Sequence, residues 1–312
     1  MTDRGSHLRP NIALAALTAC VLLLPGAGGP ATPASQAATD EPKTGGPTLY
    51  ERIASGALVV RARCRLTGKR ATVEVLEVLK GSCPLTTIQV AYRSDNLNRA
   101  AGSPKIEFEE GQESILVLER ERDDRQQLRA EDRWELVGGW RGKIDMPSEG
   151  APALVQAAQR LAAIQGLKNQ LEVWDAQKSL LREPNPILVA TGFEEILKFR
   201  LGDETLVTSL LTHLDGPRPD FRVQACRVLA QMFGRLRRTG KEIPSADLLT
   251  TETLARASGD ESPEVRAEAV RALRELRRKE LLDPLARIAT SDPNQIVRYE
   301  AQLGVMELKG GS

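Results

Sequence analysis

The chain has 312 residues, of which 41% are hydrophobic, 27% charged and 4% aromatic, a composition typical of a globular protein with about two domains. Lysine and arginine number 43 against 42 for aspartate and glutamate, and both totals fall to 41 without Asp3, Arg4 and Arg9. A chain without net charge lacks the basic surface that would attract nucleic acids or anionic membranes, so neither is an expected partner.

Residues 1–38 have the pattern of a secretory signal peptide. Two arginines precede an apolar run over residues 12–24, and Pro25 and a stretch of small residues follow it. These thirteen residues are too few to span a bilayer, which takes about 20. We predict cleavage between Ala27 and Ala38 and export to the periplasm, the cell envelope or the medium.

One motif inside this leader suggests a lipid anchor. The residues Leu17-Thr18-Ala19-Cys20 resemble the bacterial lipobox, in which the cysteine is lipidated and becomes the new N-terminus. However, the apolar run continues past Cys20 as VLLLP instead of ending there. The sequence therefore favours cleavage without lipidation, and attachment to a membrane is expected only if Cys20 is lipidated.

After a linker over residues 39–48, residues 49–148 predict a small β-barrel or sandwich. Short runs rich in β-branched residues alternate with glycine-containing turns, which is typical of five or six strands. In RATVEVLEVLK, Val73, Val75 and Val78 alternate with polar residues, but Leu76 breaks the alternation and predicts a β-bulge. The predicted strands lie at 57–66, 70–80, 86–92, 113–121, 127–139 and 140–145.

The blocks VLEVLKG and FEEGQESILVL carry a resemblance, over residues 50–146, to the netrin-like module. This is the OB-type barrel that tissue inhibitors of metalloproteinases share with many bacterial envelope proteins. Those inhibitors ligate the protease metal through an N-terminal cysteine, and no cysteine precedes Cys64 after the leader. Inhibition of a protease is therefore not carried over. The cysteines show no metal-binding spacing, and both a Cys64–Cys83 disulfide and two separate thiols remain open.

From residue 149 onward the hydrophobic period becomes helical, with an amphipathic capping helix over 151–168 and then a repeated pattern. One helix recurs four times with apolar residues spaced four, four and three apart, and the copies start at 188, 221, 265 and 297. A loop of about a dozen residues, RRTGKEIPSADL, precedes the third copy. The four sets are Leu188, Gly192, Ile196 and Phe199; Phe221, Ala225, Leu229 and Met232; Val265, Ala269, Leu273 and Leu276; Val297, Ala301, Val305 and Leu308.

A second apolar helix precedes each copy, and the turn between them carries REPNP, DGPRPD, GDESPE or SDPNQ. A helical hairpin of this kind buries its apolar stripe only by stacking on others. The segments DESPEVRAEAVRAL and DPNQIVRYEAQLGV resemble HEAT-like repeats of the type found in phycobilisome lyases. This resemblance covers about residues 168–309. The resemblance implies a ladder in which Arg222, Arg266 and Arg298 pair with turn acids such as Asp260 and Asp292; the first unit has Val189 instead.

The sequence offers little for catalysis. His213 is the one histidine after the leader, and it ends a predicted helix, where it stabilises the helix dipole. The segment Gly138–Lys143, GGWRGK, lacks the spacing of a phosphate-binding loop and predicts a turn. Cys226 follows a stripe residue and predicts a core thiol. The basic clusters 235–241 and 274–279 predict helix C-terminal caps, with an anion-binding patch as the alternative.

The predicted architecture is thus a small OB-like β-barrel followed, over residues 149–312, by an α-solenoid of about four HEAT-like hairpins. We predict no catalytic residues, no metal and no cofactor. The favoured function is an exported scaffold of a bacterial envelope that binds a protein or peptide through the solenoid. The alternatives are a lyase-type enzyme or enzyme accessory, and a protease inhibitor acting through the barrel. The sequence leaves the partner, the binding face and the oligomeric state open.

Overall fold

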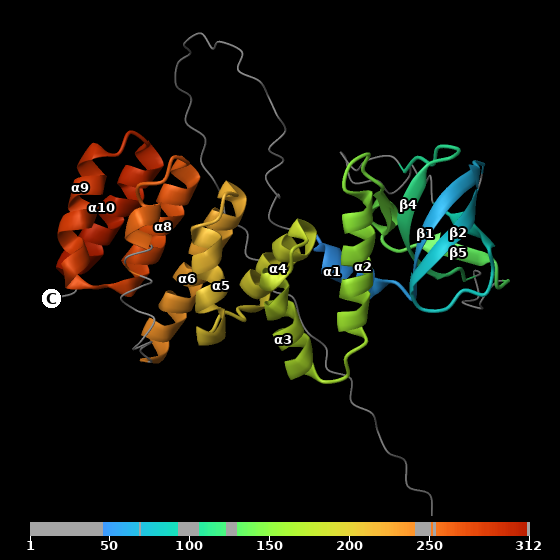
Figure 1. Cartoon of the computed structure of the whole chain (residues 1–312), viewed down its shortest axis with the longest axis horizontal. Coiled ribbons are helices and arrows are strands. Elements are labelled where there is room, and N and C mark those ends of the chain that lie inside the picture. The colour runs from blue at the N-terminus through green and yellow to red at the C-terminus, as the bar shows by residue number, and fades with distance from the viewer. Residues whose placement is uncertain are drawn as a thin grey trace, which may run out of the picture. The chain divides into compact units, whose positions relative to one another are not determined.

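A computed structural model describes residues 46–68, 70–92, 106–122, 130–240, 251 and 254–310 (Figure 1). The predicted signal peptide, with Cys20 and most of the linker, lies outside the described residues. The greater part of the predicted loop before the third repeat, residues 241–250, lies outside them as well.

The N-terminal strands form a closed ring, as predicted for an OB-like barrel. The neighbours run β1–β2–β3–β5–β4, and β4 pairs with β1 to close the ring. All these pairs are antiparallel except β3 with β5, which is parallel. Helix α1 precedes the ring and a sixth strand pairs with β4. The bounds are α1 (Leu49–Ser55), β1 (Leu58–Leu66), β2 (Ala71–Lys80), β3 (Thr87–Ala91), β4 (Glu113–Arg120), β5 (Arg133–Leu136) and β6 (Lys143–Asp145).

The predicted bulge in β2 is confirmed by the register. Arg61 pairs with Glu77 and Ala62 with Val75, which leaves Leu76 as the extra residue. Val78, however, was expected on the buried face and is 38% exposed. A second register shift near Leu79 accounts for this difference, because Leu79 packs on a different core from Val73 and Val75.

Cys64 and Cys83 of the barrel are separate thiols. Cys64 is buried in the barrel core, Cys83 packs against that core, and the three described cysteines are free. Of the two alternatives that the sequence left open, the structure has the separate thiols. Burial raises the pKa of the Cys64 thiol, which keeps it in its unreactive protonated form.

Helix α2 (Ala151–Gln165) is the predicted capping helix, and it lies beside α1 and β2 (Figure 1). Its apolar residues, from Leu154 to Ile164, share one core with Val59 and Ile115 of the barrel and with Leu188 of the first repeat. The strand β6 ends at Asp145 and α2 begins at Ala151. The hydrophobic core is continuous across this point of the chain, because α2 packs against residues of the barrel and of the first repeat in one cluster.

The described residues after α2 form the four predicted hairpins. Proline begins the second helix of three of them, which suits a position whose N–H has no partner. The first and second helices are α3 (Gln170–Ser179) with α4 (Pro186–Phe199), α5 (Val207–Leu214) with α6 (Pro219–Thr239), residues 254–257 with α8 (Pro263–Leu276), and α9 (Leu282–Ser291) with α10 (Gln295–Gly310). Consecutive second helices contact one another from α4 to α10 (Figure 1).

Fifteen of the sixteen stripe residues are buried or half-buried, and the exception is Phe199 at 50% exposed. Ala225, Ala269 and Ala301 are each fully buried at the same place in successive helices. Ala267 lies two positions before Ala269 and off the stripe, so the sequence predicts that Ala267→Leu is nearly neutral. In the structure, however, Ala267 is 8% exposed and belongs to the solenoid core. The prediction was wrong because an internal helix of a stack packs against both neighbouring repeats, so its buried arc is wider than one stripe.

Ala269→Leu is expected to overpack the solenoid core and to cost about 1–3 kcal/mol, because Ala269 has no exposed surface. Ala255→Leu, at an exposed alanine of the same hairpin, is the matched control and should change stability by less than about 0.5 kcal/mol. Urea denaturation of the two variants measures both values. Equal midpoints would contradict the stacked-hairpin core.

Candidate functional site

The predicted arginine ladder is present along the turns of the solenoid. Arg222 of α6 donates from Nη2 to Asp260 Oδ1 at 3.0 Å, and its Nε lies 2.9 Å from Asp260 Oδ2. One repeat later, Arg266 donates from Nε to Asp292 Oδ2 at 2.9 Å and from Nη2 to Oδ1 at 3.1 Å. The four side chains are only 8–13% exposed. Each arginine therefore holds the turn of the next repeat through a buried, two-point ion pair.

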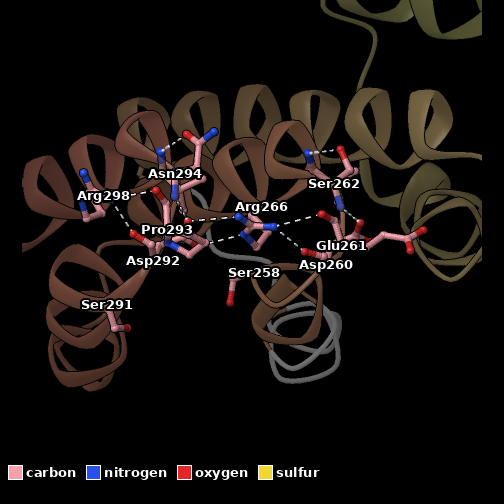
Figure 2. Close-up of polar contacts among 12 residues, drawn as sticks. Ser258, Asp260, Glu261, Ser262, Arg266, Ser291, Asp292, Pro293, Asn294 and Arg298 are labelled. Carbon is pink, nitrogen blue, oxygen red and sulfur yellow. Dashed lines mark hydrogen bonds and ion pairs between the residues drawn. The ribbon is translucent and has the colours of Figure 1, made fainter. Parts of the chain in front are cut away.

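Arg266 also closes its own turn, because its Nη1 donates to the carbonyl oxygens of Asp260 and Glu261 at 2.8 and 3.2 Å. Arg298 was expected to pair with a turn acid as well, but its Nη1 donates to the carbonyl oxygens of Asp292 and Pro293, at 2.7 and 3.0 Å. Figure 2 shows Arg266 between the two turns and Arg298 beside the second of them. The first repeat has Val189 at this position, as the sequence indicates, and the ladder starts at α6.

The aspartates have a second task in these turns. Asp260 Oδ1 accepts the N–H of Ser262 at 2.9 Å, and Asp292 Oδ1 accepts the N–H of Asn294 at 2.8 Å. Burial by itself raises the pKa of Asp292, but the hydrogen bonds from Arg266 and Asn294 outweigh it and hold the pKa below its usual value. The Asp292 carboxylate is thus committed to the ladder in its charged form.

A second ladder, which the sequence analysis missed, runs through the middle of the helices. Glu268 of α8 and Glu300 of α10 are 6% and 7% exposed. Arg227 Nε donates to Glu268 Oε1 at 3.0 Å, and Arg271 donates to Glu268 at 2.8 Å and to Glu300 at 2.7 Å. Arg274 also donates to Glu300 at 2.7 Å. The sequence could have predicted this second ladder, because the segments VRAEA and VRYEA repeat the glutamate as well as the arginine.

The basic clusters at 235–241 and 274–279 also have partners within the described residues. Arg235 donates to the carbonyl oxygens of Arg200, at 2.7 Å, and Gly202. Arg237 donates to Glu275 at 2.8 Å. Arg235 therefore caps carbonyls at the end of α4 in the neighbouring repeat, and not at the end of its own helix as predicted.

The remaining candidate residues lie in structural surroundings. His213 is in the last turn of α5, where its Nε2 lies 2.7 Å from the Leu181 carbonyl oxygen. Its ring meets the rings of Phe193 and Phe221 edge-on. Cys226 is fully buried, and burial raises its thiol pKa strongly. Residues 139–142 form a single 3₁₀ turn, as the turn prediction for GGWRGK requires.

Helix α10 carries an exposed apolar stripe. Ile296, Tyr299 and Met306 are 62%, 58% and 61% exposed, and Leu303 between them is half-buried. The corresponding residues of α8, 32 positions earlier, include Ala267, Arg271 and Arg274. Arg271 and Arg274 contact Glu300 of α10, and Ala267 is buried. The stripe of α10 therefore occupies the helix face that meets the next repeat elsewhere in the solenoid.

Comparison with known proteins agrees with the repeat assignment. Residues 207–305 match the family model of HEAT repeats. The matched region runs from α5 to α10 and contains both ladders. No curated protein matches the chain. HEAT repeats stack into solenoids whose extended surfaces commonly bind other proteins, so a role as a protein-interaction scaffold is consistent with the match.

The described residues contain no group of three or more His, Cys, Asp or Glu side chains placed to hold a metal ion. Among the described helices, none combines the length and the apolar character needed to cross a membrane.

Asp292→Asn is expected to destabilise the protein by about 3–5 kcal/mol at neutral pH, because Arg266 then keeps a buried charge without its carboxylate. The pKa of Asp292 is lower in the folded protein than in the unfolded chain, where it is about 3.9. Its carboxylate therefore contributes its full stabilisation at pH values above about 3.9, and this contribution is lost as pH falls through the pKa of the folded state. Asp292→Asn should therefore flatten the acid side of the stability profile, measured by urea denaturation at several pH values. The exposed Asp283→Asn is the control, and the same flattening in both variants would contradict the ladder.

Proposed function

We propose that this protein is an exported, non-catalytic interaction protein of a bacterial cell envelope, which binds a protein partner through the last repeat of its HEAT-like solenoid. The observation that supports this proposal is the exposed apolar stripe of α10, formed by Ile296, Tyr299, Leu303 and Met306.

A helix face that lies in water is usually polar, whereas this face of α10 is apolar and exposed. Its residues are spaced three, four and three apart, so they lie on one side of α10. In α8 the same side carries Arg271 and Arg274, which both pair with Glu300 of α10 in the next repeat. In α10 leucine and methionine replace both arginines. Such a surface suits the apolar face of a partner's helix better than water or a charged ligand.

The surroundings of the reactive residues favour binding over catalysis. A lyase-type activity requires an accessible nucleophile or an acid–base pair. Cys226 is fully buried with a raised thiol pKa, and the half-buried His213 packs against two phenylalanine rings with its Nε2 at the Leu181 carbonyl oxygen. Inhibition of a metalloprotease in the manner of the netrin-like inhibitors requires an N-terminal cysteine at the surface, and Cys64 is 1% exposed in the barrel core.

The partner site is tested by Ile296→Glu, which places a charge in the middle of the apolar stripe. Leu66→Glu on β1 is the matched control, because Leu66 is also 62% exposed and lies on the barrel. After cross-linking in the native host, the partner captured by the wild type should be lost from Ile296→Glu, by at least about ten-fold, and kept by Leu66→Glu. Loss from Leu66→Glu alone would place binding on the barrel and contradict the proposal.

Export rests on the signal-peptide pattern of residues 1–38 and is tested separately. Cell fractionation with mass spectrometry of the mature chain should find a new N-terminus between Gly28 and Thr39. An acylated Cys20 as the first residue would show that the protein is a lipoprotein. An intact Met1 in the cytosol would contradict export in either form.

A further inference from the structure

A buried carboxylate in the first repeat takes no part in either ladder. Glu195 of α4 has no exposed surface, although a glutamate is rarely buried completely unless a cation pairs with it. Its Oε1 accepts the hydroxyl proton of Thr48 at 2.6 Å, and its Oε2 accepts from Gln177 Nε2 at 3.1 Å. Both donors are neutral, so the hydrogen bonds of Glu195 do not compensate a negative charge as an arginine would.

The charged groups around Glu195 also favour its neutral form. Lys198 of α4 attracts the carboxylate, but this lysine is already paired with Glu51 of α1. Glu51 itself and Glu194 of α4 repel it, Tyr50 of α1 also faces it, and α3 meets it with a neutral amide. Burial and the two neighbouring carboxylates outweigh the hydroxyl hydrogen bond and the lysine, so the pKa of Glu195 lies above its ordinary value.

The neighbouring amide provides an acceptor for the proton of a neutral Glu195. Gln177 is buried, and its Oε1 has no hydrogen-bond donor while its Nε2 donates to Glu195. A half-turn of this amide exchanges the two atoms, so that Oε1 accepts the proton carried on Glu195 Oε2. Glu195 Oε1 continues to accept from Thr48. The half-turn leaves one amide atom unsatisfied as before, but protonation removes a buried charge, which is the larger cost.

Thr48 connects the state of Glu195 to helix α1. Its hydroxyl oxygen accepts the N–H of Glu51 at 3.1 Å and so caps the helix, while its hydroxyl proton is donated to Glu195. Helix α1 has seven residues, too few to be stable in water without its cap and its packing. The ion pair of Glu51 with Lys198 also joins α1 to α4, but it is partly exposed and contributes little. The polar attachment of α1 to the first repeat therefore depends mainly on the Thr48–Glu195 bond.

We propose that the Thr48–Glu195 contact is a proton-dependent latch, which holds α1 on the first repeat while Glu195 is protonated. Loss of the proton leaves a buried charge, and the opening of α1 relieves it by admitting water to the carboxylate. Ile53 of α1 lies in the core that the barrel shares with the first repeat, so the latch acts at the junction of the two domains. This junction tightens in acid and loosens as the pH rises. The latch is separate from the α10 stripe, and either proposal can fail without the other.

The test is hydrogen exchange of the full chain at several pH values, read at the Arg52 amide, which donates to the Thr48 carbonyl oxygen at 2.9 Å. A glutamate with a raised folded pKa stabilises the closed state fully below its unfolded pKa of about 4.3, and this contribution is lost as the pH rises through the folded pKa. The protection factor at Arg52 should fall by up to about ten-fold per pH unit over that interval and then level off. The Arg298 amide of α10 should show no such fall. A flat profile at Arg52, or an equal fall at both amides, would overturn the proposal.

Glu195→Gln isolates the carboxylate, because a glutamine is neutral at every pH and its N–H donates to Gln177 Oε1 as the protonated acid does. Protection at Arg52 should then stay at the acid level of the wild type throughout. Glu280→Gln, at an exposed glutamate before α9, is the matched control and should keep the wild-type profile. If Glu195→Gln fails to fold, NMR of the Glu195 carboxyl carbon in the wild type decides, and it should titrate above about pH 4.3. Titration at or below that value, or a wild-type profile in Glu195→Gln, would contradict the latch.

Discussion

The buried pairs Arg222–Asp260 and Arg266–Asp292 are the constraint on which the rest of the solenoid depends. Each guanidinium reaches from one repeat to the turn of the next, and each aspartate also shapes that turn through a backbone N–H. A buried ion pair adds little net stability, because desolvation offsets the attraction. Its effect here is geometric: shifting a helix by one residue would break two ion contacts and a turn hydrogen bond together.

Where this constraint is missing, other contacts replace it. The first repeat has Val189 in place of the arginine, and α4 meets α6 through an aromatic cluster of Phe193, His213 and Phe221. Gln231 and Arg235 of α6 reach the carbonyl oxygens of Leu197 and Arg200. Lys178 of α3 also donates to Asp203 Oδ2 of the second repeat at 2.9 Å. The first junction is thus held by aromatic, carbonyl and charged contacts together, and the two later junctions have the Arg–Asp pairs of the ladder in addition to their apolar packing.

Patterns that repeat along the chain were predictable, and properties that depend on which element becomes a neighbour were not. The strands, the bulge at Leu76 and the hairpins follow from local periodicity and from the repeated segments, whereas the Arg–Asp ladder was implied by the resemblance to HEAT-like repeats. Burial of Ala267 and exposure of Phe199 depend instead on packing. Ala267 belongs to the solenoid core, whereas Phe199 at the end of α4 is exposed and lines a cleft together with Trp174 of α3. This cleft lies between α1 and helices more than a hundred residues later in the chain, and the periodicity of the sequence does not predict a contact of that kind.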